Sequence, residues 1–200
     1  MKNRQVSSMW ARLRNSVAAL HSDCRGLAAT EFAIVVPVML LLFFGTDEFA
    51  SGIAVNRKVT VMARTLSDLT SQNVSIADTQ LTNFYNASAA IMTPYSATPV
   101  RSTITELYID PATLAARVQW SKGAAPRAVG TTVAIPSALQ VGDTYLIYSE
   151  VTYAFVPAVG YVLRNSITLS DHSFTRPRQS RCVIYPTPAV GTALPSCPTS

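Results

Sequence analysis

The sequence predicts an α+β protein in which one long N-terminal helix lies on a small antiparallel sheet of about four strands. Three observations predict this arrangement. An apolar run near the N-terminus passes directly into an amphipathic helical pattern, the middle of the chain is rich in strand-forming residues, and turn residues separate the predicted strands. Because the apolar stripe of the helix and the apolar face of the sheet both need cover, each is expected to bury the other.

The first 26 residues form a basic leader. Its acidic residue is Asp23, and its basic residues are Lys2, Arg4, Arg12, Arg14 and Arg25. Residues 27–200 hold the other eleven basic and ten acidic groups, so the net charge of +5 belongs mainly to the leader. Nucleic acid is therefore not expected as a partner. A positive segment before an apolar one instead keeps the N-terminus of a membrane protein in the cytoplasm.

Residues 27–46 are predicted to span a membrane. The eighteen residues 27–44 contain one charged residue, Glu31, and one helix breaker, Pro37. About 20 apolar residues cross a hydrocarbon core, so this run and the two residues after it are long enough. A cleavable secretory signal is disfavoured, because the run exceeds the roughly 7–15 residues of a signal core and contains a carboxylate. The leader orients the span in the inner membrane with the rest of the chain outside the cytoplasm.

Residues 47–72 are predicted to extend this helix beyond the membrane as an amphipathic segment. They contain no proline, and most of their apolar residues recur at spacings of three or four: Ile53, Val55, Val59, Met62, Leu66 and Leu69. This periodicity is typical of a helix with one buried face. We therefore expect one helix over residues 28–71, with a kink at Pro37, which cannot donate a hydrogen bond to the carbonyl of Ala33.

Residues 75–181 are predicted to form an extracytoplasmic α+β domain. A short helix is expected over residues 75–93, just before Pro94. Strand-forming residues and period-two alternation then predict four strands, at residues 101–109, 114–120, 144–156 and 166–174. Residues 122–142 contain three glycines and two prolines and are expected to form a long connection.

Residues 182–200 are predicted to be a poorly ordered tail, because they are rich in proline, serine and threonine. If the domain is exported, Cys182 and Cys197 can form a disulfide, whereas Cys24 in the leader stays reduced in the cytoplasm. The alternative is that both C-terminal cysteines are unpaired thiols in a flexible tail.

The boundary between the leader and the apolar run carries a recognisable motif. Gly26 ends the leader, and Glu31 is the fifth residue after it. This spacing resembles the processing site of type IV prepilins, and the stretch that includes Glu31, Phe32 and Pro37 resembles the N-terminal block of TadE-like pseudopilins of tight-adherence (Tad) pilus systems. The resemblance implies that a prepilin peptidase cleaves between Gly26 and Leu27. It also implies that Glu31 and Phe32 serve recognition and assembly.

The resemblance also implies a function. It is specific over residues 25–72 and loose over residues 145–178. The length of 200 residues exceeds that of the short major Tad pilins, which favours a minor pseudopilin or a pilus-assembly subunit. The implied partners are the inner membrane, the prepilin peptidase, other pilins or pseudopilins, and the Tad assembly proteins.

Other function classes have less support in the sequence. The histidines are His21 in the leader and His172 in a predicted strand, where neighbouring side chains point to opposite faces. We therefore predict no catalytic residue, no metal site and no cofactor. An uncleaved, signal-anchored periplasmic envelope or binding protein is the main alternative. A membrane-anchored enzyme is a third, and it requires a convergent polar pocket within residues 101–176.

Overall fold

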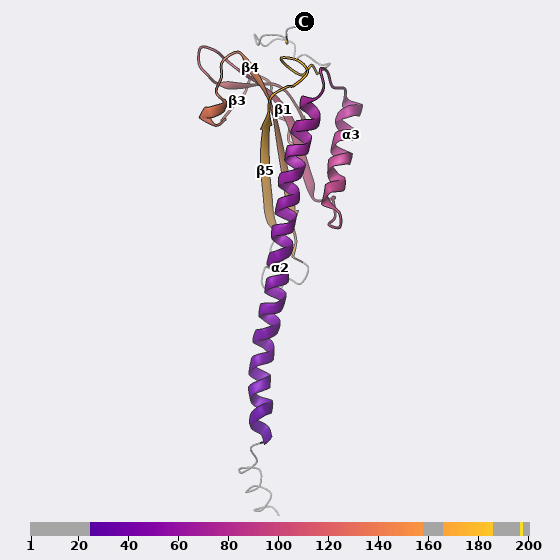
Figure 1. Ribbon diagram of the computed structural model, residues 1–200, viewed down its shortest axis with the longest axis vertical. Coiled ribbons are helices and arrows are strands. Elements are labelled where there is room, and N and C mark those ends of the chain that lie inside the picture. The colour runs from indigo at the N-terminus through magenta and orange to yellow at the C-terminus, as the bar shows by residue number, and fades with distance from the viewer. Residues whose placement is uncertain (1–24, 158–165, 186–196, 198–200) are drawn as a thin grey trace, which may run out of the picture. The chain divides into compact units, whose positions relative to one another are not determined.

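The computed structural model describes residues 25–157, 166–185 and Cys197. The predicted leader up to Cys24 and the predicted tail beyond Tyr185, Cys197 excepted, lie outside the described residues. The chain divides into two compact units, residues 1–47 and residues 48–200, and helix α2 (Arg25–Ser71) belongs to both. The second unit is an α+β domain, which Figure 1 shows as a sheet with α2 and α3 beside it, and this confirms the predicted fold class.

The domain contains two further helical segments before its sheet and one within it. They are α3 (Asp78–Ala89), the short 3-10 helix η1 (Ala90–Met92) and a second 3-10 helix, η2 (Ser137–Leu139). The strands are β1 (Val100–Ile109), β2 (Ala116–Gly123), β3 (Thr132–Val133), β4 (Thr144–Phe155) and β5 (Ile167–Thr175).

All five strands form one antiparallel sheet in the order β3-β2-β1-β4-β5. The pairing of β1 with β2 shifts register between Glu106 and Leu107, which is the mark of a β-bulge. The sequence predicts about four strands, and the sheet in the structure has five. The additional strand, β3, is only two residues long and lies inside residues 122–142, which the sequence assigns to a connection.

The part of α2 within the domain packs on one face of this sheet through an apolar stripe. The stripe consists of Val55, Val59, Met62, Ala63 and Leu66, and it joins one buried core with Ile104, Ile147 and Val151 of β1 and β4. Burying one large apolar side chain stabilises a fold by about 1.5–3 kcal/mol, so this contact fixes the helix on the sheet. Ile53 is not part of the stripe and is 46% exposed, because it lies two residues, or roughly 200° of helical rotation, before Val55.

Hydroxyl groups join α2 to the edge strand β5. The Thr60 hydroxyl donates a hydrogen bond to the Asp171 carboxylate, and this bond lowers the pKa of Asp171. Two turns further along, the Oγ of Ser67 lies 3.1 Å from the Oγ of Ser173 and 2.9 Å from the Oγ1 of Thr175. The helix therefore contacts the edge of the sheet through polar groups. It contacts the centre mainly through apolar groups, with one buried hydrogen bond of 2.5 Å from the Ser149 hydroxyl of β4 to the Ala63 carbonyl.

Helix α3 begins later than its sequence pattern predicts, at Asp78 instead of residue 75. The reason is a contact with the C-terminal segment, because Ser75 forms a parallel bridge with Ile184. The Ile76 N–H donates to the Ile184 carbonyl at 2.9 Å, and the Ile184 N–H donates to the Val74 carbonyl at 2.9 Å. Residues 74–76 are thereby held extended and cannot enter the helix.

The opposite face of the sheet has a smaller core of its own. It contains Leu107, Ile109, Val118, Leu146 and Tyr148 from the strands, and Val133, Ile135 and Leu139 from the segment after β2. Residues 122–142 therefore cover the second face, and β3 is the place where this cover pairs with β2.

Candidate functional site

Gly26, at the predicted cleavage site, lies in the first turn of α2. The helix begins at Arg25, and a Cβ placed on Gly26 would meet no atom within 4 Å. N–H groups in the first turn of a helix lack a carbonyl partner within the helix, and glycine is among the residues least favourable to helix. The bond after Gly26 therefore lies where the helix is easiest to unwind into the extended form that a protease cleft binds.

Glu31 and Phe32 follow within the next two turns, and both are exposed in this structure. Glu31 is four residues after Leu27, so the two positions lie on the same helix face one turn apart. Phe32 is 70% exposed. The structure thus presents Gly26, Glu31 and Phe32 on one accessible stretch of helix.

The apolar run after Glu31 is exposed along its length. The helix continues through Pro37, and it is the one described helix that is long and apolar enough to cross a membrane. None of the residues in its most apolar window is buried in the protein. Large side chains exposed there include Ile34, Val38, Met39, Leu41, Leu42 and Phe43. Such exposure is expected of a helix that anchors the chain in a membrane.

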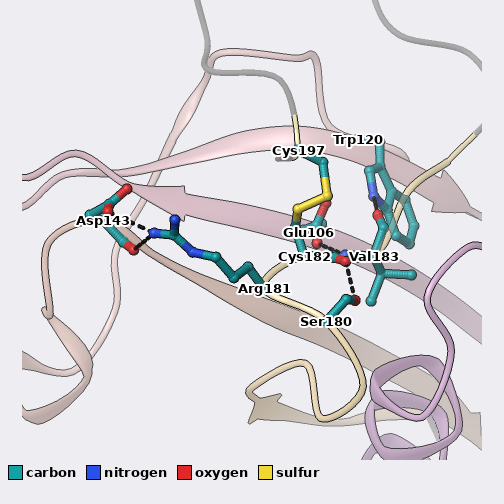
Figure 2. Close-up of a disulfide and its surroundings, with 8 residues drawn as sticks. All are labelled: Glu106, Trp120, Asp143, Ser180, Arg181, Cys182, Val183 and Cys197. Carbon is teal, nitrogen blue, oxygen red and sulfur yellow. Dashed lines mark hydrogen bonds and ion pairs between the residues drawn. A yellow bond between two sulfur atoms is a disulfide. The ribbon is translucent and has the colours of Figure 1, made fainter. Parts of the chain in front are cut away.

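The C-terminal cysteines lie on the domain. The structure joins Cys182 and Cys197 in a disulfide, with their Cα atoms 5.8 Å apart (Figure 2). Cys182 is fully buried and packs against Tyr108 of β1 and Tyr145 of β4. Val183, next in the chain, is also fully buried. Residues 182–185, which the sequence assigns to a poorly ordered tail, therefore belong to the domain core.

A buried carboxylate lies under this disulfide, as Figure 2 shows. Glu106 of β1 is 2% exposed, and its Oε1 accepts a hydrogen bond of 2.5 Å from the Val183 N–H. The indole N–H of Trp120 donates to the Val183 carbonyl at 2.9 Å. Both main-chain polar groups of Val183 are thus bonded to side chains of the sheet. We call Glu106, Trp120, Val183 and the disulfide of Cys182 and Cys197 the C-terminal clamp.

Burial raises the pKa of Glu106 to about 8, and the hydrogen bond from Val183 offsets part of that rise. Glu106 is not among the functional residues predicted from the sequence. The sequence nevertheless contains a pattern that could have indicated it. Ile104, Glu106 and Tyr108 alternate onto one face of a strand, and a carboxylate on such an apolar face needs a hydrogen-bond partner. The partner, Val183, is 77 residues further along the chain.

The polar groups near His172 form hydrogen bonds within the domain. Asp171 accepts hydrogen bonds from the Thr60 hydroxyl and, at 2.8 Å, from the His172 N–H. A depression between α2 and β5 is lined by polar residues, but two of them, Asp68 and Arg178, form an ion pair of 2.5 Å. Within the described residues no group of three or more His, Cys, Asp or Glu side chains is placed to hold a metal ion.

Comparison with known proteins finds a family model that matches the N-terminal part of the chain. Residues 26–66 match the family model described as TadE-like protein. The match begins at Gly26, covers the apolar run and ends within the amphipathic part of α2, which confirms the predicted family for this block. No curated protein and no solved structure matches the chain.

Proposed function

Because residues 26–66 form a TadE-like domain, we propose that the chain is a minor pseudopilin or assembly subunit of a Tad-type pilus, processed by a prepilin peptidase after Gly26. The observation that carries the proposal is the position of Glu31, five residues after Gly26, at the start of an exposed apolar helix. The role proposed is structural and involves no catalysis by this chain.

The proposed location is the inner membrane, with the N-terminus in the cytoplasm and the sheet domain in the periplasm or outside the cell. The five basic residues of the leader support this orientation. The disulfide between Cys182 and Cys197 supports it independently, because disulfides persist in oxidising compartments. The proposed partners are the prepilin peptidase, other pilins or pseudopilins, and Tad assembly proteins.

Cleavage after Gly26 would change the chemistry around Glu31. It creates an α-amino group on Leu27, which is positive near neutral pH. That amine is four residues before Glu31, close enough to pair with the carboxylate of the same helix or a neighbouring one. A carboxylate within a membrane is costly without a partner. A pair between subunits would set their register, and such a pair contributes specificity more than stability.

The first prediction concerns the cleavage itself. N-terminal sequencing of the membrane-bound protein should begin at Leu27, and Gly26→Val should leave the leader attached, because the added branched side chain opposes the fit in a protease cleft. Ala29→Val, three residues away in the same turn, is the matched control and should still be processed. Retention of Met1 in the unmodified protein would favour the signal-anchored envelope or binding protein, and a start near Asp47 would favour a secretory signal.

The second prediction concerns assembly. Glu31→Gln should leave membrane insertion intact and processing largely so, while it lowers the recovery of partner pilins in a pull-down by about tenfold, which corresponds to about 1.4 kcal/mol. Asp47→Asn removes an exposed carboxylate at the other end of the apolar run and should leave recovery unchanged. If the cleaved Glu31→Gln protein recovers its partners undiminished and normal pili form, Glu31 has no role in register.

A further inference from the structure

Strand β5 is one of the two outer strands of the sheet, which has the order β3-β2-β1-β4-β5. The other outer strand, β3, has two residues, whereas β5 pairs with β4 over all nine of its residues. Within the parts of the chain that the structure describes, no further strand pairs with β5. A long outer strand presents main-chain N–H and C=O groups to which another extended chain can pair. Of the two outer strands, β5 therefore offers the longer edge for such pairing.

The hydrogen bonds of β1 determine which residues of β5 point their main-chain groups outward. The Ala124 N–H donates to the Ser102 carbonyl at 2.8 Å, and at the other end of β1 the Asp110 N–H donates to the Ala115 carbonyl at 3.1 Å. Even-numbered residues of β1 therefore face β2, and odd-numbered ones face β4, because successive residues of a strand face opposite neighbours. The registers carry this alternation across β4, so the odd-numbered residues of β5 face β4. Its even-numbered residues point their main-chain groups outward.

The outward edge of β5 is open at its start and closed further along. The outward N–H of His172 donates to the Asp171 carboxylate at 2.8 Å, so a side chain of the strand itself already occupies this donor. Thr168 and Ser170 come before this point and are both exposed. Among the described residues, none forms a hydrogen bond with the outward main-chain groups of these two. The open part of the edge therefore runs from Ile167 to Ser170.

An apolar groove of about 460 Å³ lies beside this open part of the edge. Ile167 and Leu169 line the groove from β5, and Phe49 and Ile53 line it from α2. An extended chain paired with β5 would place every second side chain on the same face of the sheet as those of Ile167 and Leu169. These side chains would enter the groove. The open edge and the groove thus form one site, the first part for main chain and the second for side chains.

The charged groups of the groove favour one kind of side chain besides apolar ones. Arg57 lines the groove and is exposed, whereas Glu48, the other charged residue of the lining, is 3% exposed. None of the ion pairs between described residues involves Arg57. Arg57 is three residues before Thr60, which bonds Asp171, so it lies toward the Asp171 end of the site. A carboxylate on the bound chain would complement its guanidinium there.

We propose that this site binds an extended segment of a partner protein, which adds to the open edge of β5 as an antiparallel strand. Antiparallel addition continues the pairing of the whole sheet. The segment carries an acidic residue for Arg57 and, after it at alternate positions, apolar side chains for the groove. Main-chain hydrogen bonds supply the affinity, and the groove selects the sequence. A partner helix would fill the groove but would leave the outward main-chain groups of β5 unused. The site lies apart from Gly26 and Glu31 in the sequence and goes beyond the proposed role in pilus assembly.

The test uses the peptide Thr-Asp-Thr-Val-Thr-Ile-Thr, with fluorescein at its N-terminus and an amide at its C-terminus. Its binding to the full chain in phospholipid nanodiscs is measured by fluorescence anisotropy. With the aspartate, valine and isoleucine on the groove side, the threonines point their main-chain groups toward β5. N-methylation of the threonines should therefore lower the affinity at least about tenfold, whereas N-methylation of the other three residues should leave it within about twofold.

Two pairs of variants test the two parts of the site. Ser170→Pro removes an outward N–H and no donor to β4, so it should lower the affinity about tenfold, whereas Ser170→Ala keeps the N–H and should bind as the parent does. Ile53→Thr should lower the affinity about fivefold by removing apolar contact in the groove. Its matched control is Val61→Thr, because Val61 is also exposed on α2, at 48%, and does not line the groove. Unfolding curves equal to that of the parent would exclude misfolding of each variant.

Several results would overturn the proposal. Equal losses from the two sets of N-methyl groups would show that the peptide does not add as a strand. Equal affinity for Thr-Asp-Thr-Thr-Val-Ile-Thr, in which the apolar residues are adjacent, would show that the groove selects nothing. Absence of saturable binding to the parent chain would rule out the site. Self-association of the chain that Ser170→Pro abolishes would identify a second copy, and not a partner protein, as the occupant of the edge.

Discussion

Replacement of Cys197 by serine is expected to lower the free energy of unfolding of the domain by about 3 kcal/mol. The disulfide closes a loop with a sequence separation of 15, and a cross-link over such a loop removes about that much conformational entropy from the unfolded chain. The loss also weakens the C-terminal clamp, because residues 182–185 are then held only by noncovalent contacts. Those contacts include the bridge between Ser75 and Ile184, so the extended segment 74–76 that follows α2 should loosen as well.

Trp120 provides the measurement, since its indole donates to the Val183 carbonyl and so reports on the clamp directly. Guanidinium unfolding of the detergent-solubilised full chain is followed by tryptophan fluorescence in a Trp10→Phe background, which leaves Trp120 as the tryptophan observed. Cys24→Ser is the matched control, because it removes the cysteine of the leader and should leave the curve unchanged. Superimposable curves for Cys197→Ser and the parent would show that the disulfide does not stabilise the domain.

The contact between helix and sheet could be predicted from the sequence because it follows from local periodicity. Val55, Val59, Met62 and Leu66 recur with the helical period, and all four are buried against the sheet. The same periodicity misplaced Ile53, which lies off this stripe and is 46% exposed. A count of apolar residues at roughly helical spacing does not separate two faces of one helix when both are apolar.

The parts that could not be predicted depend on contacts between distant residues. Strand β3 exists because residues 122–142 cover the second face of the sheet, and two residues carry too little pattern to be recognised as a strand. Residues 182–185 look like a tail in composition, yet they are buried because Glu106 and Trp120 bind both polar groups of Val183. No local pattern in the C-terminal segment indicates these partners.

The buried carboxylate of Glu106 gives the domain a pH dependence whose sign can be worked out. Burial raises its pKa from the ordinary value of 4.5 to about 8. An acid whose pKa is raised on folding contributes stability that is fully present below the pKa of the unfolded chain and is lost as the pH rises through the folded value. Glu106 should therefore stabilise the fold most below pH 4.5, and this contribution should disappear by about pH 8.

Glu106→Gln is expected to remove this dependence. The glutamine oxygen can accept the Val183 N–H as the carboxyl oxygen does, but the side chain never ionises. The difference in free energy of unfolding between the variant and the parent should therefore shift in favour of the variant by about 4–5 kcal/mol between pH 4.5 and pH 8, given about 1.4 kcal/mol for each pKa unit. Unfolding curves monitored by Trp120 at several pH values provide the measurement.

The matched control for this experiment is Asp110→Asn, because Asp110 titrates outside the same pH window. Hydrogen bonds from the N–H groups of Ala112 and Thr113 lower the pKa of Asp110 below its ordinary value of 3.8. The variant and the parent should therefore differ by a constant amount from pH 4.5 to pH 8, whatever the size of that difference. If Glu106→Gln also differs from the parent by a constant amount, Glu106 is ionised across the whole window. Its bond to Val183 would then be a charged one, and the clamp would gain strength from the carboxylate instead of losing it as the pH rises.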